Sequence, residues 1–194
     1  MDYRHNRLLL IDDMARRRFL RGSATLSGAA IALLAGHPSL AAQGCPGAAD
    51  TAADVRILNT ALSAEREAIA AYQVAAESGL LRPPLHAVAV QFQGHHKAHA
   101  ELLAKTVAQL GGKPVEVKRG YEFPTEQLKA EADVLRFAAE LERGAVSAYL
   151  GAVPLFGNPE LAKAAASILG DEAMHWAVLR QALGEDPVPS PFMS

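Results

Sequence analysis

Apolar residues recur every three or four positions along most of this chain, from about residue 51 to residue 184. This is the period of an α-helix with one apolar face. Proline and glycine separate the periodic stretches: Pro83 opens the second, Gly111 closes it, and Pro159 and Gly184 bound the fourth. Proline near a helix start and glycine after a helix end are common boundary signals. The pattern therefore predicts four helices, at about 51–78, 83–110, 125–152 and 159–183.

The lengths of the connections predict how these helices pair. Short segments join the first helix to the second and the third to the fourth, so each pair is expected to form an antiparallel hairpin. A longer connector, residues 113–124, separates the two pairs and can cross the bundle. Two hairpins joined by a long crossover predict an all-α fold, a four-helix bundle over residues 51–184. An irregular tail is expected at residues 185–194, which contain three prolines.

An eight-residue phrase occurs twice, once in the first predicted helix and once in the third. Glu65–Tyr72 reads EREAIAAY and Glu142–Tyr149 reads ERGAVSAY, with five of the eight positions identical. A weaker echo relates Gly94–His99 to Gly170–His175. Similarity at a fixed spacing predicts an internal duplication in which each copy is one helix hairpin.

Glutamate and histidine interrupt the apolar faces at one depth of the predicted bundle. Six residues share this position: Glu65, His96, His99, Glu142, Glu172 and His175. Charged side chains are seldom buried unless they are paired or bound to a metal ion. Carboxylates and imidazoles on facing helices form metal sites in helical bundles, so these six residues are candidate metal ligands. A metal-free core of ion pairs is the alternative, although buried ion networks are costly.

The set resembles the ferritin-like superfamily of di-metal carboxylate proteins. In that family, two helices each supply one glutamate and the other two each supply a Glu-x-x-His motif. The resemblance covers residues 54–183. Five residues match the family pattern: Glu65 and Glu142 as the single glutamates, Glu172 and His175 as one full motif, and His99 as the histidine of the other. It implies ferritin-like connectivity and a di-metal site.

His96 departs from the family pattern, because it stands where the resemblance implies a second bridging glutamate. The family set of four glutamates and two histidines carries a charge of −4, which neutralises two divalent ions. Here three glutamates and three neutral histidines carry −3. Imidazole also bridges two metals less readily than a carboxylate does. The site is therefore expected to hold one or two transition-metal ions, and its ligands do not choose among iron, manganese and zinc. The resemblance implies iron first, with manganese or zinc as alternatives.

Three further residues are interpreted as supporting the ligands. Tyr72 and Tyr149 lie two turns after their glutamates on the same helix faces. The resemblance implies that such tyrosines can hydrogen-bond a ligand, and core packing is the alternative reading. His95 lies one turn before His99 but one position off the apolar face. It is expected to be partly exposed or to support a ligand, and ligation is its alternative role.

Residues 1–42 are expected to be an export signal and not part of the bundle. The signal resembles the twin-arginine type, and the residues that carry the match are Arg16, Arg17, Phe19 and Leu20. An apolar stretch over residues 22–36 and small residues up to residue 42 follow, as in cleaved signals. The apolar stretch is short for a membrane span. Met14 lies directly before the motif, so the first 13 residues are interpreted as an over-extended start.

Charge and cysteine content narrow the class of protein. The net charge is −2, and removing residues 1–42 changes it to −5. Without a basic stripe, nucleic acid is not an expected partner. Cys45 is the only cysteine, which excludes an intramolecular disulfide. Cys45 lies in the predicted linker, residues 43–50. A second interpretation of the N-terminus is that a lipid anchor is attached to this cysteine.

Taken together, the sequence predicts an exported, periplasmic ferritin-like protein that binds metal. Its expected partners are the metal ion and the twin-arginine translocation machinery, and a homodimer is compatible with the sequence. The resemblance implies oxidative chemistry of iron or manganese, or reactions with oxygen or peroxide, as in a ferroxidase- or peroxidase-type oxidoreductase. Two alternatives stay open because a fold does not settle function. One is a non-catalytic metal-binding, storage or stress protein, and the other is a metal-free helical scaffold.

Overall fold

A computed structural model describes residues 48–193 of the chain. Within this range there are four α-helices and no β-strand. The helices are α2 (Ala48–Glu77), α3 (Pro83–Gln109), α4 (Glu131–Ala152) and α5 (Pro159–Ala182), with short 3₁₀ turns η1 (Thr125–Gln127) and η2 (Val153–Leu155). The predicted export signal and Cys45 lie outside the described residues. Of the helices described, none is both long and apolar enough to cross a membrane.

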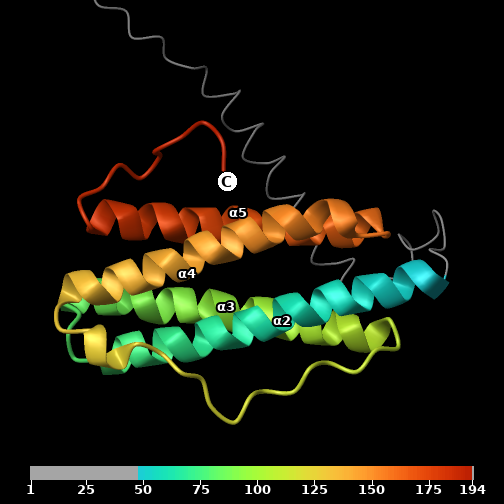
Figure 1. The fold of residues 1–194 in the computed structure, drawn as a ribbon, viewed down its shortest axis with the longest axis horizontal. Helices are drawn as coiled ribbons and strands as arrows, with labels where there is room; N and C mark the ends of the chain where they lie inside the picture. The colour runs from blue at the N-terminus through green and yellow to red at the C-terminus, as the bar shows by residue number, and fades with distance from the viewer. Residues whose placement is uncertain (1–47, 194) are drawn as a thin grey trace, which may run out of the picture.

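The four helices form the expected bundle. The chain reverses direction between α2 and α3 and again between α4 and α5, so each pair is an antiparallel hairpin (Figure 1). Between the hairpins, the connector runs back along the bundle from the end of α3 to the start of α4. Asn59 fixes it to α2, since its side chain donates to the Lys113 carbonyl at 3.1 Å and accepts from the Val115 N–H at 2.7 Å. The predicted all-α, ferritin-like four-helix bundle is confirmed.

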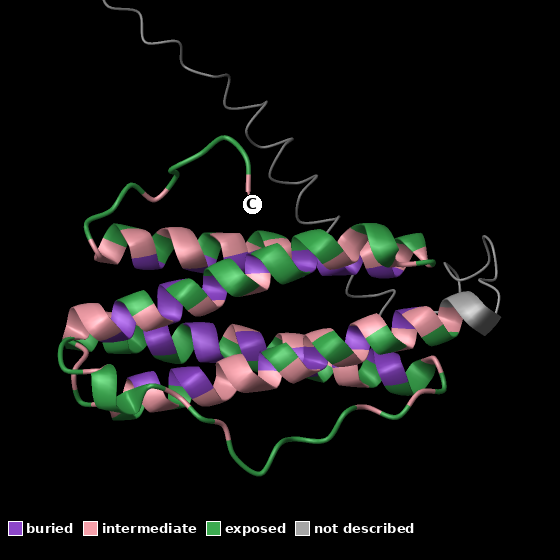
Figure 2. Cartoon of the chain, in the orientation of Figure 1, coloured by how far each residue is buried: buried purple, intermediate pink, exposed green. Residues whose placement is uncertain are grey.

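The interior consists of two apolar clusters with a polar layer between them. One cluster is built around Leu58, Leu62, Leu103, Val107, Leu161 and Ile168. The other is built around Tyr72, Phe92, Leu135, Ala138 and Leu179. Buried residues follow the inward faces of all four helices (Figure 2). Each large apolar side chain contributes about 1.5–3 kcal/mol when fully buried, which offsets the cost of the polar layer.

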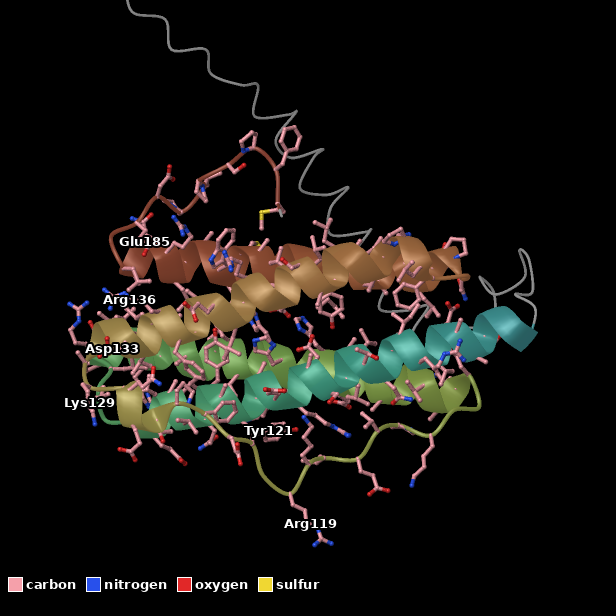
Figure 3. The ribbon with its side chains drawn as sticks, viewed as in Figure 1. Arg119, Tyr121, Lys129, Asp133, Arg136 and Glu185 are labelled. Carbon is pink, nitrogen blue, oxygen red and sulfur yellow. The ribbon has the colours of Figure 1, made fainter. Side chains whose placement is uncertain are left out.

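The helix boundaries differ from the sequence-based expectation at two starts. Helix α2 begins at Ala48, three residues before the expected start. Helix α4 begins at Glu131, and the predicted start near Thr125 is instead the separate turn η1. The reason is local capping: the Asp133 carboxylate accepts hydrogen bonds from the N–H groups of Lys129 and Ala130, at 3.2 and 2.9 Å. Asp133 and Lys129 both lie at this end of α4 (Figure 3).

Candidate metal centre

The six candidate ligands converge in the polar layer at the bundle centre. Helices α2 and α4 each contribute one glutamate, α3 contributes two histidines, and α5 contributes one glutamate and one histidine. Five of the residues are almost fully buried, at 0–3% exposed: Glu65, His96, Glu142, Glu172 and His175. The His99 side chain is 14% exposed. The helical spacing that placed these residues on inward faces therefore also brings them to one depth.

The donor atoms form two overlapping groups. Glu65, His96, His99 and Glu172 each offer one atom within 4.8 Å of the others, and so do His96, Glu142, Glu172 and His175. His96 and Glu172 belong to both groups. The two groups therefore share one imidazole and one carboxylate, and the two oxygens of Glu172 face different histidines.

Several of these atoms are close together without being hydrogen-bonded. His99 Nδ1 lies 3.1 Å from Glu172 Oε1, and His175 Nδ1 lies 3.3 Å from Glu172 Oε2 and 3.5 Å from Glu142 Oε1. Even so, both Nδ1 atoms, both Glu172 oxygens and Glu142 Oε2 have no hydrogen-bond partner. Buried polar atoms without partners are rare and costly.

The chemistry of the donor set also fits a transition metal. Imidazole nitrogen together with carboxylate oxygen suits iron, manganese or zinc. The set contains no cysteine, so it is not a thiolate site. The residues present therefore fit the metal that the sequence resemblance implies.

His96 lies between the two single glutamates. Its Nδ1 is 2.8 Å from Glu65 Oε2, and its Nε2 is 3.3 Å from Glu142 Oε1. Its ring also stacks against Tyr72, with ring centroids 5.3 Å apart. Both ring nitrogens thus face carboxylates, and binding a metal through either one would require that nitrogen to leave its carboxylate partner.

The two tyrosines bond to glutamates across the bundle. The Tyr149 hydroxyl donates to Glu65 Oε1 at 2.6 Å, and the Tyr72 hydroxyl donates to Glu142 Oε1. Each tyrosine therefore serves the glutamate of the opposite hairpin. Burial, and after it the nearby glutamates, raise the pKa of each hydroxyl well above its usual value. Both side chains consequently stay protonated hydrogen-bond donors, which goes beyond simple packing.

Asp171 is a functional candidate that sequence reasoning missed. Its Oδ2 lies 3.4 Å from Nε2 of both His99 and His175, and 3.2 Å from His95 Nδ1. His99 and His175 therefore direct Nδ1 toward the glutamates and Nε2 toward Asp171. Carboxylates in this position orient histidine ligands and raise their basicity. A signal was present, since Asp171 directly precedes Glu172 and aligns with His95 in the second echo.

His95 lies at the edge of the centre. Its side chain is 37% exposed, and its Nδ1 lies 2.9 Å from His175 Nε2. It is thus a partly exposed residue in contact with a candidate ligand. With Asp171 and His175 it makes a third, outer group of donor atoms.

Without a metal, the centre is an ion network. Burial opposes charge on His96, but its hydrogen bonds to Glu142 and Glu65 outweigh burial and raise its pKa to about 10. Burial also opposes charge on His99 and His175. Contacts with neighbouring carboxylates outweigh burial and raise the pKa of His99 to about 11 and that of His175 to about 9. Burial raises the pKa of Glu65 and Glu142, yet the histidines lower both below the usual value. A metal ion bound through these histidines would therefore displace protons from them.

The family comparison agrees with the fold and the residue pattern. The family described as "Ferritin-like domain" matches residues 53–185. This range holds all four described helices apart from the first turn of α2. No curated protein matches the chain in sequence at a significant level.

Three solved structures have a similar fold. A conserved hypothetical protein from Mycobacterium tuberculosis, Rv2844, has a TM-score of 0.64 and 22% identity, over 74% of this chain and 99% of that one. The bacterioferritin of Desulfovibrio desulfuricans, described with a diiron site, has a TM-score of 0.65 and 22% identity, over 73% and 83%. A ferritin-like diiron-carboxylate protein from Bacillus anthracis strain Ames has a TM-score of 0.60 and 25% identity, over 69% and 97%.

Proposed function

Because this chain belongs to the family of ferritin-like domains, we propose that its bundle centre binds transition-metal ions for oxidative chemistry. One observation carries the proposal: five buried nitrogen and oxygen atoms of the candidate ligands lack hydrogen-bond partners, although four of them lie 3.1–3.5 Å from another ligand atom. Ions bound at the centre would satisfy these atoms. Two of the similar structures are described as diiron proteins, which supports iron as the first candidate.

The donor groups divide the proposed ligands between two positions. Glu65 and His99 belong to one position, Glu142 and His175 to the other, and Glu172 lies between them. His96 can serve either position through one ring nitrogen. When bound, iron would supply electron transfer to oxygen or peroxide, as a ferroxidase- or peroxidase-type activity requires.

Residues around the ligands would prepare them for this role. The tyrosine hydroxyls hold one oxygen of Glu65 and one of Glu142, which limits the rotation of each carboxylate. Asp171 faces Nε2 of His99 and His175, so it favours the tautomers whose Nδ1 is free to bind a metal. The apolar clusters at both ends give the centre largely non-polar surroundings, which strengthens electrostatic interactions there.

The N-terminal motif supports export of the folded protein to the periplasm. A twin-arginine signal implies that the translocation machinery is a partner and that a metal can be inserted before export. The reciprocal Tyr–Glu bonds relate the two hairpins symmetrically, which supports the proposed internal duplication.

A metal-free polar core is the second candidate, and one observation favours it. Protonated His96, His99 and His175 can offset negative charge of the neighbouring carboxylates at neutral pH. The two candidates differ in what Glu142 does. As a ligand it determines metal content, and as an ion-pair partner it affects stability alone.

Metal titration of matched variants separates these two roles. The full chain, stripped of metal, is titrated anaerobically with ferrous iron and followed by calorimetry. Glu142→Gln is expected to lose one iron or to bind it about 10–100-fold more weakly. Glu101→Gln, on the exposed face of α3, is the control and should match the wild type. A wild-type protein that binds no iron, manganese or zinc would exclude the proposal.

A further inference from the structure

A groove with a volume of about 530 Å³ runs between α2 and α4. These two helices are neighbours in the bundle (Figure 1). Small residues, one turn apart, form much of its two walls: Ala61, Ala64 and Ala68 on α2, and Gly144, Ala148 and Gly151 on α4. Because these side chains are too short to fill the space between the helices, the groove is a direct consequence of the sequence.

The groove reaches the candidate metal centre. Four of its lining residues are buried, at 1–5% exposed, and all four belong to the centre: Glu65, His96, Glu142 and Tyr149. Among their atoms, Glu142 Oε2 has no hydrogen-bond partner. The groove therefore connects the surface with the polar layer, and a molecule bound in it would lie beside the proposed metal ligands.

We propose that this groove binds an uncharged, largely apolar small organic molecule. Pockets for such molecules typically measure about 300–1,000 Å³ and combine apolar walls with a few polar groups, as this one does. That the molecule is also the substrate of the metal centre rests on the proposed function. That the groove binds it rests on the groove alone.

The charges around the groove select against an anion. Glu67 and Glu140 lie in its lining with Glu65 and Glu142, and none of its described lining residues is lysine or arginine. Lys118 approaches Glu67 at 3.9 Å from the connector, but an exposed pair of this kind contributes little. His96 offsets Glu65 and Glu142 inside the groove. Glu67 and Glu140 in its more exposed part still disfavour a carboxylate, sulfonate or phosphate by like-charge repulsion.

A second copy of the chain is the other occupant to consider. A helix with its side chains is about 10–12 Å across. It could cover the outer edge of the groove near Leu155, which is 66% exposed, but it is too wide to pass between two helices of one bundle to reach Glu142. The depth of the groove therefore favours a small molecule.

Two fluorescent probes with the same ring skeleton test the proposal. N-phenyl-1-naphthylamine is uncharged, and 8-anilinonaphthalene-1-sulfonate carries a negative charge. Each is titrated into the full chain and into three variants. Ala148→Phe and Ala64→Phe fill the groove from opposite walls, and Ala98→Phe adds the same ring at an exposed position on α3 as the control. Thermal melting shows whether each variant is folded.

The neutral probe should bind the wild type and Ala98→Phe equally, and bind a folded groove variant about tenfold or more weakly. The sulfonated probe should bind the wild type about tenfold more weakly than the neutral one. Equal binding of the neutral probe to the wild type and a folded groove variant would overturn the proposal. The proposal would also be overturned if the wild type formed a dimer that binds no probe and if Ala148→Phe converted that dimer to a monomer.

Metal content, measured on the same samples, keeps this test separate from the proposed function. Probe binding as predicted in a protein that takes up no metal would leave the groove proposal standing and remove the metal centre. Normal metal uptake without specific probe binding would overturn the groove proposal and leave the metal centre standing.

Discussion

His96 Nδ1 lies 2.8 Å from Glu65 Oε2 at the centre of the bundle. A histidine thus occupies the place where the family resemblance implies a second bridging carboxylate. The contact shows what this replacement does in the metal-free centre: His96 neutralises the carboxylate that a metal would otherwise bind. We therefore expect His96 to make the metal occupancy of this centre differ from that of a site with four glutamates.

Replacing His96 with glutamate should increase metal occupancy. His96→Glu restores a carboxylate and one negative charge, so a second ion should bind more tightly, by about tenfold or more. His96→Ala should lose one ligand and bind metal more weakly while the helix stays folded, because alanine is a good helix former. Calorimetric titration of the three proteins with ferrous iron measures both effects. Identical stoichiometry and affinity in all three would show that His96 is not a ligand.

The metal-free protein should lose stability as the pH rises above neutrality. Folding raises the pKa of His96, His99 and His175 from 6.5 to about 10, 11 and 9. Their contribution to stability is therefore fully present below about pH 6.5 and lost as the pH rises through these folded values. Urea unfolding of the metal-free protein between pH 6 and pH 10 should show this decline. The decline should be smaller in His99→Gln.

Metal binding should depend on pH in the opposite direction. Each ion must displace protons from the histidines, so affinity should increase over the same pH range. Titration in buffers with different ionisation enthalpies gives the number of protons released. Release of no protons at pH 7 would contradict the protonated metal-free centre.

Removing the hydroxyl of Tyr149 should destabilise the protein. Tyr149→Phe leaves the buried Glu65 Oε1 without its donor, and a hydrogen bond to a charged group contributes about 1.5–3 kcal/mol. Tyr72→Phe should behave similarly, because it removes the donor to Glu142. The partly exposed Tyr121 of the connector gives the control, Tyr121→Phe. If Tyr149→Phe and Tyr121→Phe have the same unfolding free energy, Tyr149 contributes by packing alone.

Asp171 should act on the metal through the histidines. Asp171→Asn removes the negative charge that faces Nε2 of His99 and His175, so metal affinity should fall by about 10–100-fold while the number of bound ions stays the same. Asp171→Glu should recover part of the affinity. Loss of a whole ion in Asp171→Asn would instead make Asp171 a direct ligand.

The N-terminal motif can be tested independently of the bundle. Replacing Arg16 and Arg17 together by lysine should block export, because the paired arginines carry the resemblance to a twin-arginine signal. Fractionation of cells that express each protein measures the outcome. Normal periplasmic accumulation of the double variant would remove the export proposal.

The helical period accounts for what the sequence predicted well. Glu65, Glu142 and Glu172 sit in register with buried leucines and alanines, so their inward direction followed from spacing alone. Asp171 is one position off that register, and its contacts depend on how α3 and α5 face each other. The start of α4 was misplaced because Thr125 resembles an N-cap, whereas the Asp133 carboxylate caps the chain at Ala130, so the helix begins six residues later, at Glu131. The groove escaped prediction because its alanines and glycines also suit an ordinary exposed face.

Anomalous X-ray diffraction at the iron edge, on crystals of the iron-loaded protein, tests the central claim most directly. The account predicts one or two anomalous peaks beside Glu172. Each peak should lie about 2.0–2.2 Å from its nitrogen and oxygen ligands, among them Nδ1 of His99 or His175. A centre without a peak, in which both Nδ1 atoms donate hydrogen bonds to Glu172, would contradict the account and leave a metal-free ion network.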